Sequence, residues 1–198
     1  EREKTMDHEI MEKLALLSAL RGTQDDDSNG EMYVSSIHDA INLLQQHMNP
    51  GGARYRREIV EYITDPANRV LSECDLYHNF VMDLFRVGDF DLALQVCDYA
   101  LSNAPYNRDM LGDAIKACGD SSQFEKGDSY LERARTIPLN RWSFRLFLYS
   151  VDFLKTKLSA YPLDEKLYSE ALELADEYIK NLPFDEHGYN QKAELLVM

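Results

Sequence analysis

The stretch that decides the fold is Tyr77–Asn107, YHNFVMDLFRVGDFDLALQVCDYALSNAPYN. Its apolar residues recur every three or four positions, which is the spacing of one face of an α-helix. In its middle stands Gly88, and glycine adopts the left-handed conformation that ends a helix more readily than other residues. The segments before and after Gly88 are therefore predicted to be two helices joined by a tight turn.

The same stretch resembles a tetratricopeptide repeat, a pair of antiparallel helices in about 34 residues. Such a repeat has large apolar residues on its first helix, a Gly-acidic-aromatic turn, an early alanine and a late Ala-Leu pair on its second helix, and a closing proline. The matching residues are Tyr77, Phe80, Leu84, Gly88-Asp89-Phe90, Ala93, Ala100-Leu101 and Pro105. Val81 departs from the pattern, because the family usually has glycine or alanine there.

Two weaker copies follow the first. The second offers Leu111, Ala114, Ile115, Cys118, Phe124, Gly127, Leu131, Ala134 and Pro138, with Ser122 in place of the turn glycine. The third offers Phe144, Phe147, Leu148 and Val151, then Tyr168, Ala171, Ala175, Tyr178, Ile179 and Pro183. An insertion from Leu154 to Pro162 predicts longer helices in the third pair. Each copy closes with a proline, followed by a residue suited to N-capping the next helix: Asn107, Asn140 and Asp185.

The predicted fold class is all-α. Residues 73–185 are read as three helix pairs, and residues 186–198 as a capping helix or the start of a further repeat, with Tyr189, Ala193 and Leu196 on one face. Residues 1–72 carry three amphipathic helices that could be degenerate repeats. One pair cannot bury its own apolar face, so neighbouring pairs must stack. The resemblance implies an α-solenoid of antiparallel pairs with a right-handed superhelical twist.

In this family, the first helix of each pair lines a concave face that binds peptides or partner helices. The inward-facing residues implied by the resemblance are His78, Met82 and Phe85, then Asp109, Gly112 and Lys116, then Trp142, Arg145 and Tyr149. Trp142 could instead pack against the preceding pair. A clamp for a partner's terminal carboxylate is not predicted, because the comparable positions, Asn79, Asp113, Lys116 and Arg145, hold too few cations.

Charge and composition narrow the class of partner. The net charge is −14, so nucleic acid is not expected, and a basic or apolar protein segment is. The one basic cluster, Arg54, Arg56 and Arg57, is read as a solvated helix face rather than a phosphate site. No apolar run approaches the roughly 20 residues that span a bilayer, so no membrane partner is expected. The chain begins at Glu1 and ends inside an apolar run, so we expect a fragment of a longer protein.

Neither the acidic loop nor the cysteines carry a complete site for metal binding or catalysis. Asp25, Asp27, Asn29 and Gly30 match the first half of an EF-hand loop, but Ser36 stands where a bidentate glutamate is needed, so a solvated acidic loop is favoured. The three cysteines, Cys74, Cys97 and Cys118, are odd in number and unpaired in spacing, which favours a reducing, cytoplasmic setting. Cys97 and Cys118 are predicted core residues rather than nucleophiles. We therefore predict no metal, no cofactor and no enzymatic activity.

The resemblance implies a protein–protein interaction scaffold that binds a peptide or partner protein on the concave face of the helical array. The alternative is a regulatory, sensor or dimerisation domain of a larger protein, such as a transcriptional regulator. Nothing positive in the sequence supports an enzyme.

Overall fold

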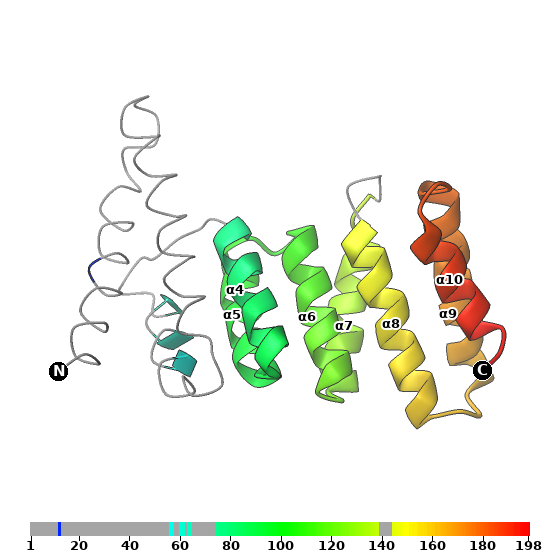
Figure 1. Cartoon of the computed structure of the whole chain (residues 1–198), viewed down its shortest axis with the longest axis horizontal. Coiled ribbons are helices and arrows are strands. Elements are labelled where there is room, and N and C mark those ends of the chain that lie inside the picture. The colour runs from blue at the N-terminus through cyan, green and yellow to red at the C-terminus, as the bar shows by residue number, and fades with distance from the viewer. Residues whose placement is uncertain (1–11, 13–55, 58–59, 62, 65–73, 139–143) are drawn as a thin grey trace. The chain divides into compact units, whose positions relative to one another are not determined.

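The computed structural model describes residues 12, 56–57, 60–61, 63–64, 74–138 and 144–198, and this part of the chain is helical without strands. Its labelled helices are α4 (Cys74–Val87), α5 (Phe90–Asn103), α6 (Arg108–Asp120), α7 (Phe124–Arg135), α8 (Phe144–Ala160), α9 (Glu165–Asn181) and α10 (Glu186–Leu195) (Figure 1). The all-helical prediction is confirmed for these residues. Most of residues 1–72, including the acidic loop at Asp25–Gly30, lie outside the described residues. Of the three helices predicted there, the structure describes only positions 12, 56–57, 60–61 and 63, which are helical.

The chain divides into two compact units, Glu1–Asn103 and Ala104–Met198. In the first unit, α4 packs against α5. The apolar stripe of α4, which includes Tyr77, Phe80 and Leu84, is almost fully buried, as are Ala93 and Cys97 on α5. Each large side chain buried in this way contributes about 1.5–3 kcal/mol relative to an exposed one. The two small residues of α5 allow the helices to approach closely.

The turn after α4 has the geometry that the sequence predicts. Gly88 has a φ of 75°, in the left-handed region. The Asp89 amide donates to the Leu84 carbonyl at 3.0 Å, and the Gly88 amide donates to the Phe85 carbonyl at 3.1 Å. This pair of bonds is a Schellman motif, which satisfies carbonyls that the end of a helix leaves without partners.

The same motif recurs after α6, at positions 34 residues further along. The Gln123 amide donates to the Cys118 carbonyl at 2.8 Å, and the Ser122 amide donates to the Gly119 carbonyl at 3.1 Å. Ser122, which stands in place of glycine, has a φ of 57°. A serine therefore takes the left-handed conformation that the turn requires.

The prediction for the basic cluster is wrong at Arg56. The sequence predicts a solvated helix face there, yet Arg56 is only 5% exposed. Its guanidinium Nε pairs with the carboxylate of Asp89, the residue after the turn glycine. The ion pair explains how a charged side chain can be buried here, whereas Arg57 is exposed.

In the second unit, α6 packs against α7 and α8, and α8 packs against α9 and α10. The core contains large apolar side chains from several helices, among them Met110, Ile115, Phe147 and Phe153. The ring of Phe147 on α8 is stacked on that of Tyr178 on α9, with centroids 5.2 Å apart. α8 therefore lies at the centre of the unit, in contact with every other helix.

Three helix starts carry a side-chain cap. Asn107 accepts from the Met110 amide at 2.9 Å, Asp164 from the Leu167 amide at 2.9 Å, and Asp185 from the His187 amide at 3.0 Å. The predicted caps at Asn107 and Asp185 are confirmed, and Asn140 lies outside the described residues. Each such cap contributes about 1 kcal/mol.

The insertion in the third copy lengthens its helices, as predicted. α8 and α9 each have 17 residues, compared with 13 in α6 and 12 in α7. The additional length of α8 is packed, because Phe124 at the start of α7 meets the rings of Phe153 and Tyr161 edge-on at 6.1 and 5.9 Å.

One core prediction in this unit is wrong. Phe144 is 40% exposed, because it is the first residue of α8 and projects at the end of the helix, where its ring lies 5.7 Å from the Arg145 guanidinium. On α10, Tyr189 and Leu196 are 50% and 61% exposed. The buried side of α10 instead consists of Gly188, Gln191 and Leu195, which meet α8 and α9.

Candidate functional site

α6 and α8 approach each other closely at Gly112. A Cβ atom added to this glycine would lie 3.4 Å from the Cα of Leu146 and 3.4 Å from Cδ2 of Tyr149. On α6, Asp109 and Lys116 lie one helical turn before and after Gly112. The two helices therefore bring together Asp109, Lys116, Arg145 and Tyr149, four of the residues that the sequence nominates for binding. We call these four side chains the α6–α8 surface.

Lys116 contributes a positive charge held against an aromatic ring. Its Nζ lies 5.6 Å from the ring centroid of Tyr149, within the range of a cation–π interaction. The same Nζ donates to Oδ2 of Asp120 at 2.9 Å. The side chain remains 29% exposed, so the cation is positioned but still accessible.

Arg145 and Asp109 form a loose ion pair at the other end of this surface. Arg145 Nη1 and Asp109 Oδ1 are 4.0 Å apart, too far for a direct hydrogen bond. The two side chains are 38% and 48% exposed. Exposed pairs of this kind contribute roughly 0–1 kcal/mol, so a partner could replace either member at low cost.

Tyr149 presents a protonated hydroxyl. Burial raises its pKa above the usual value, and the charge of Asp113 raises it further, while the charge of Arg145 opposes them. Asp113 lies beneath this surface with no exposed area. The Tyr149 hydroxyl is therefore a neutral hydrogen-bond donor throughout the physiological pH range.

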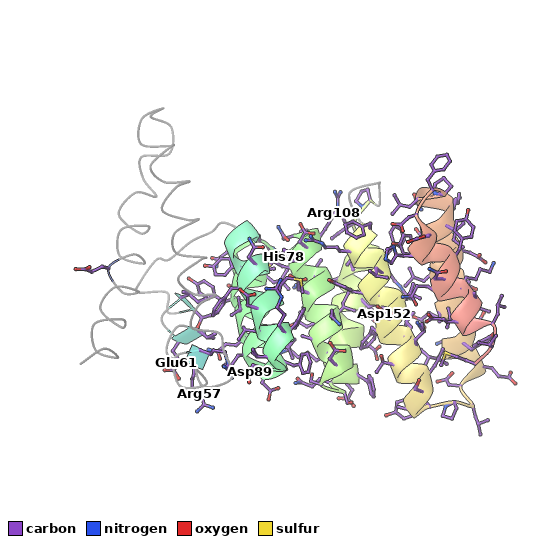
Figure 2. The ribbon with its side chains drawn as sticks, in the orientation of Figure 1. Arg57, Glu61, His78, Asp89, Arg108 and Asp152 are labelled. Atoms are coloured by element: carbon purple, nitrogen blue, oxygen red, sulfur yellow. The ribbon has the colours of Figure 1, made fainter. Side chains whose placement is uncertain are left out.

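A polar network joins α8 to α10 further along the same side of α8. Lys155 Nζ donates to Gln191 Oε1 at 2.7 Å, and Gln191 Nε2 donates to Oδ1 of Asp152 at 2.7 Å. Lys155 also pairs with Glu194. Figure 2 marks Asp152 on α8. Because these groups bind one another, their main role is to hold α10 in place.

The other nominated residues lie elsewhere. His78, Met82 and Phe85 belong to α4 in the first unit, where His78 is marked in Figure 2. His78 is only 9% exposed, and the ring of Phe85 meets that of Phe90 at 6.0 Å. Trp142 lies outside the described residues.

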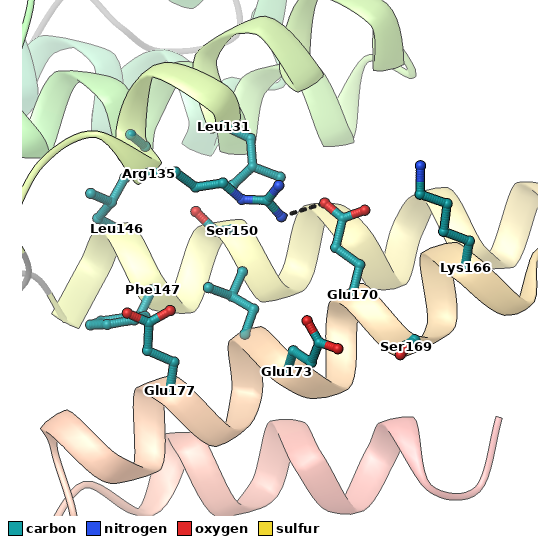
Figure 3. A pocket seen from close by; sticks show the side chains of 12 residues that line it. Leu131, Arg135, Leu146, Phe147, Ser150, Lys166, Ser169, Glu170, Glu173 and Glu177 are labelled. Atoms are coloured by element: carbon teal, nitrogen blue, oxygen red, sulfur yellow. Dashed lines mark hydrogen bonds and ion pairs between the residues drawn. The ribbon is translucent and has the colours of Figure 1, made fainter.

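The structure also contains a pocket that the sequence did not predict. It has a volume of about 500 Å³ and is lined by α7, α8 and α9, each of which contributes apolar side chains to its floor (Figure 3). We call it the α7–α9 pocket. In the sequence, the spacing of Glu170, Glu173 and Glu177 indicates that they share one side of a helix. The apolar floor between the helices had no local signal, because residues from three helices form it.

Groups that could support chemistry are sparse in the described part of the chain. No cluster of three or more histidine, cysteine or acidic side chains there could hold a metal ion. Cys97 and Cys118 form no disulfide and have no exposed surface, in line with their prediction as core residues. None of the helices among the described residues has the length and apolar character needed to cross a membrane.

Comparisons of the chain with protein-family models, with curated proteins and with solved structures found no match.

Proposed function

We propose that the chain is a tetratricopeptide-like interaction module whose α6–α8 surface binds a segment of a partner protein. Several features support the repeat assignment. The Schellman turns at Gly88 and Ser122 are 34 residues apart, which is the length of such a repeat. The small residues Ala93 and Gly127 have the same separation and are both buried. In this proposal, the helix pairs are antiparallel and stack as an α-solenoid.

The observation that carries the binding proposal is the composition of the α6–α8 surface. Tyr149 and Arg145 belong to the residue types that most often dominate binding energy at interfaces. Both are partly exposed and stand beside charges of either sign. The surface therefore offers a ring face, a neutral hydroxyl donor, two cations and a carboxylate to an extended chain.

The partner in this proposal is a basic or apolar protein segment. The chain carries a net charge of −14, and a field of that sign accelerates encounter with cations and repels phosphate backbones. Cys97 and Cys118 are buried and form no disulfide, which is compatible with a reducing compartment, and we assign the module to the cytoplasm on that basis.

A displayed library of random peptides, selected on the whole chain, tests this function. Binders are then measured by fluorescence anisotropy against Asp109→Lys/Tyr149→Ala. We expect affinity to fall about tenfold or more, because the variant loses the aromatic ring and replaces the carboxylate of the surface by a cation that repels a basic segment. Circular dichroism of the variant confirms that it remains folded.

The matched control is Glu132→Lys, which changes an exposed charge on α7 away from both the α6–α8 surface and the α7–α9 pocket. It should leave the affinity within about twofold. A library that yields no binder, or binders whose affinity is unchanged by Asp109→Lys/Tyr149→Ala, would count against the α6–α8 surface as the binding site.

A further inference from the structure

The α7–α9 pocket lies on a different side of α8 from the α6–α8 surface. Leu146, Phe147 and Ser150 point into the pocket, whereas Arg145 and Tyr149 belong to the α6–α8 surface. At 100° per residue, Leu146 and Ser150 are rotated by about 100° from Arg145 and Tyr149 respectively. A ligand in the pocket would therefore leave the α6–α8 surface uncovered.

The floor of the pocket is apolar and already packed. Leu131 and Leu146 are each 3% exposed, Phe147 is 1% exposed and Leu174 is 8% exposed. These side chains are held from behind by the core, so the floor does not need to reorganise to receive a ligand. The volume of about 500 Å³ lies within the range typical of ligand-binding clefts and is large enough for more than one side chain.

The rim of the pocket is charged unevenly. Arg135 on α7 pairs with Glu170 on α9, which closes one part of the rim (Figure 3). Glu173 and Glu177 follow on α9, one helical turn apart, and both are exposed. Figure 3 shows both carboxylates beside the opening, and neither forms an ion pair with a described residue. The rim therefore has two carboxylates placed to receive a cation beside an apolar floor.

We propose that the α7–α9 pocket binds a basic–apolar segment of a partner protein. A leucine, methionine or phenylalanine of the segment occupies the floor formed by Leu146, Phe147 and Leu174. A neighbouring lysine or arginine lies against Glu173 and Glu177. Charge complementarity selects this occupant, because the three glutamates of the lining outnumber its two cations, Arg135 and Lys166, and the chain carries a net negative charge. This site is independent of the α6–α8 surface and adds a second contact to the proposed function.

A pair of designed peptides tests the site. Both are 12-residue, fluorescein-labelled peptides with two leucines at an i, i+4 spacing, flanked by lysines in one and by glutamates in the other. The protein is the whole chain, alone and as Glu173→Lys/Glu177→Lys, and the control is Glu132→Lys. We expect anisotropy to report binding of the lysine peptide only. Reversal of Glu173 and Glu177 should weaken it about tenfold, whereas the control should change it less than twofold.

A second variant, Ser169→Trp, separates the pocket from general electrostatics. Ser169 lines the rim and is exposed, so a tryptophan there fills the opening without altering a core residue or a charge. It should weaken binding of the lysine peptide at least as strongly as the double charge reversal. Equal binding of both peptides, or undiminished binding by Ser169→Trp, would overturn the proposal.

The experiments distinguish failure of the pocket proposal from failure of the α6–α8 proposal. If Asp109→Lys/Tyr149→Ala abolishes binding of the lysine peptide while Glu173→Lys/Glu177→Lys does not, the pocket proposal is wrong and the α6–α8 surface is supported. If the pocket variants alone lose this peptide, the pocket proposal is supported. Loss of the library-selected peptides then remains the separate test of the α6–α8 surface.

Discussion

Gly127 on α7 lies directly against the ring of Phe153 on α8. A Cβ atom at position 127 would lie 2.5 Å from Cζ of Phe153 and 3.0 Å from Cβ of Cys118, well inside van der Waals contact. The bulk of Phe153 is therefore accommodated by the missing side chain of Gly127. This relationship explains why a residue that weakens helices stands in the first turn of α7.

Gly127→Ala should destabilise the chain by about 1–2 kcal/mol. Overpacking a dense core costs about 1–3 kcal/mol, which the better helix propensity of alanine offsets by up to about 1 kcal/mol. Urea denaturation followed by circular dichroism measures the difference. Gly119→Ala is the matched control, because its Cβ would meet Phe153 at 3.5 Å, an ordinary contact. Equal stability of the two variants would show that Phe153 can move aside.

The two Schellman turns predict that substitutions of Ser122 and Gly88 change the free energy of unfolding in opposite directions. Ser122 has a φ of 57°, so Ser122→Gly should raise the free energy of unfolding by about 0.5–1 kcal/mol. Gly88 has a φ of 75°, and nothing lies within 4 Å of a Cβ added there, so Gly88→Ala should cost about 1 kcal/mol through the backbone alone. Thermal denaturation of both variants checks the prediction, which fails if the two shifts have the same sign.

Asp185 makes stability depend on pH in the acidic range. Burial alone would raise its pKa, but hydrogen bonds from the His187 amide and ring and from the Tyr178 hydroxyl outweigh burial and lower it. Since the folded pKa lies below the unfolded one, the stabilisation is complete above the unfolded pKa and is lost as pH falls through the folded pKa. Urea denaturation from about pH 6 to pH 2 should therefore show Asp185→Asn converging on the native chain below about pH 4.

The stability difference between Asp185→Asn and the native chain depends on how well the substituted side chain caps α10. At about pH 6, Asp185→Asn should be less stable than the native chain by about 1 kcal/mol, because an asparagine still caps α10 but accepts weaker hydrogen bonds. Tyr178→Phe removes one of the donors and should reduce the pH dependence without abolishing it. A constant difference between the native chain and Asp185→Asn at all pH values would contradict a lowered pKa.

Lys155 holds α10 against α8. Its ammonium donates to Gln191 and pairs with Glu194, and its side chain is only 17% exposed. Lys155→Met keeps the apolar stem and should lower stability by about 1–2 kcal/mol, because Gln191 loses a charged donor. Hydrogen exchange should show faster exchange of the α10 amides while those of α6 keep their protection. Lys180→Met, at an exposed position on α9, should leave α10 unchanged.

Local features of the sequence determined where the helices begin and end. The spacing of apolar residues, the prolines past helix ends and the caps at Asn107 and Asp185 predicted the described helices, because helix formation and termination depend on neighbours within one or two turns. The same reasoning identified Gly88 as a left-handed turn residue and Cys97 and Cys118 as core residues. The resemblance to a tetratricopeptide repeat, rather than local spacing, nominated Lys116, Arg145 and Tyr149, which the structure brings together.

Tertiary structure decided which side of a helix is buried and where cavities form. Arg56 is buried because Asp89, distant in sequence, supplies its counter-charge. Tyr189 and Leu196 are exposed because α10 meets α8 through Gln191 and Leu195 instead. The α7–α9 pocket requires residues from three helices at once, and no local pattern encodes such a gap. Non-local packing, rather than periodicity, therefore decides which surfaces this chain exposes.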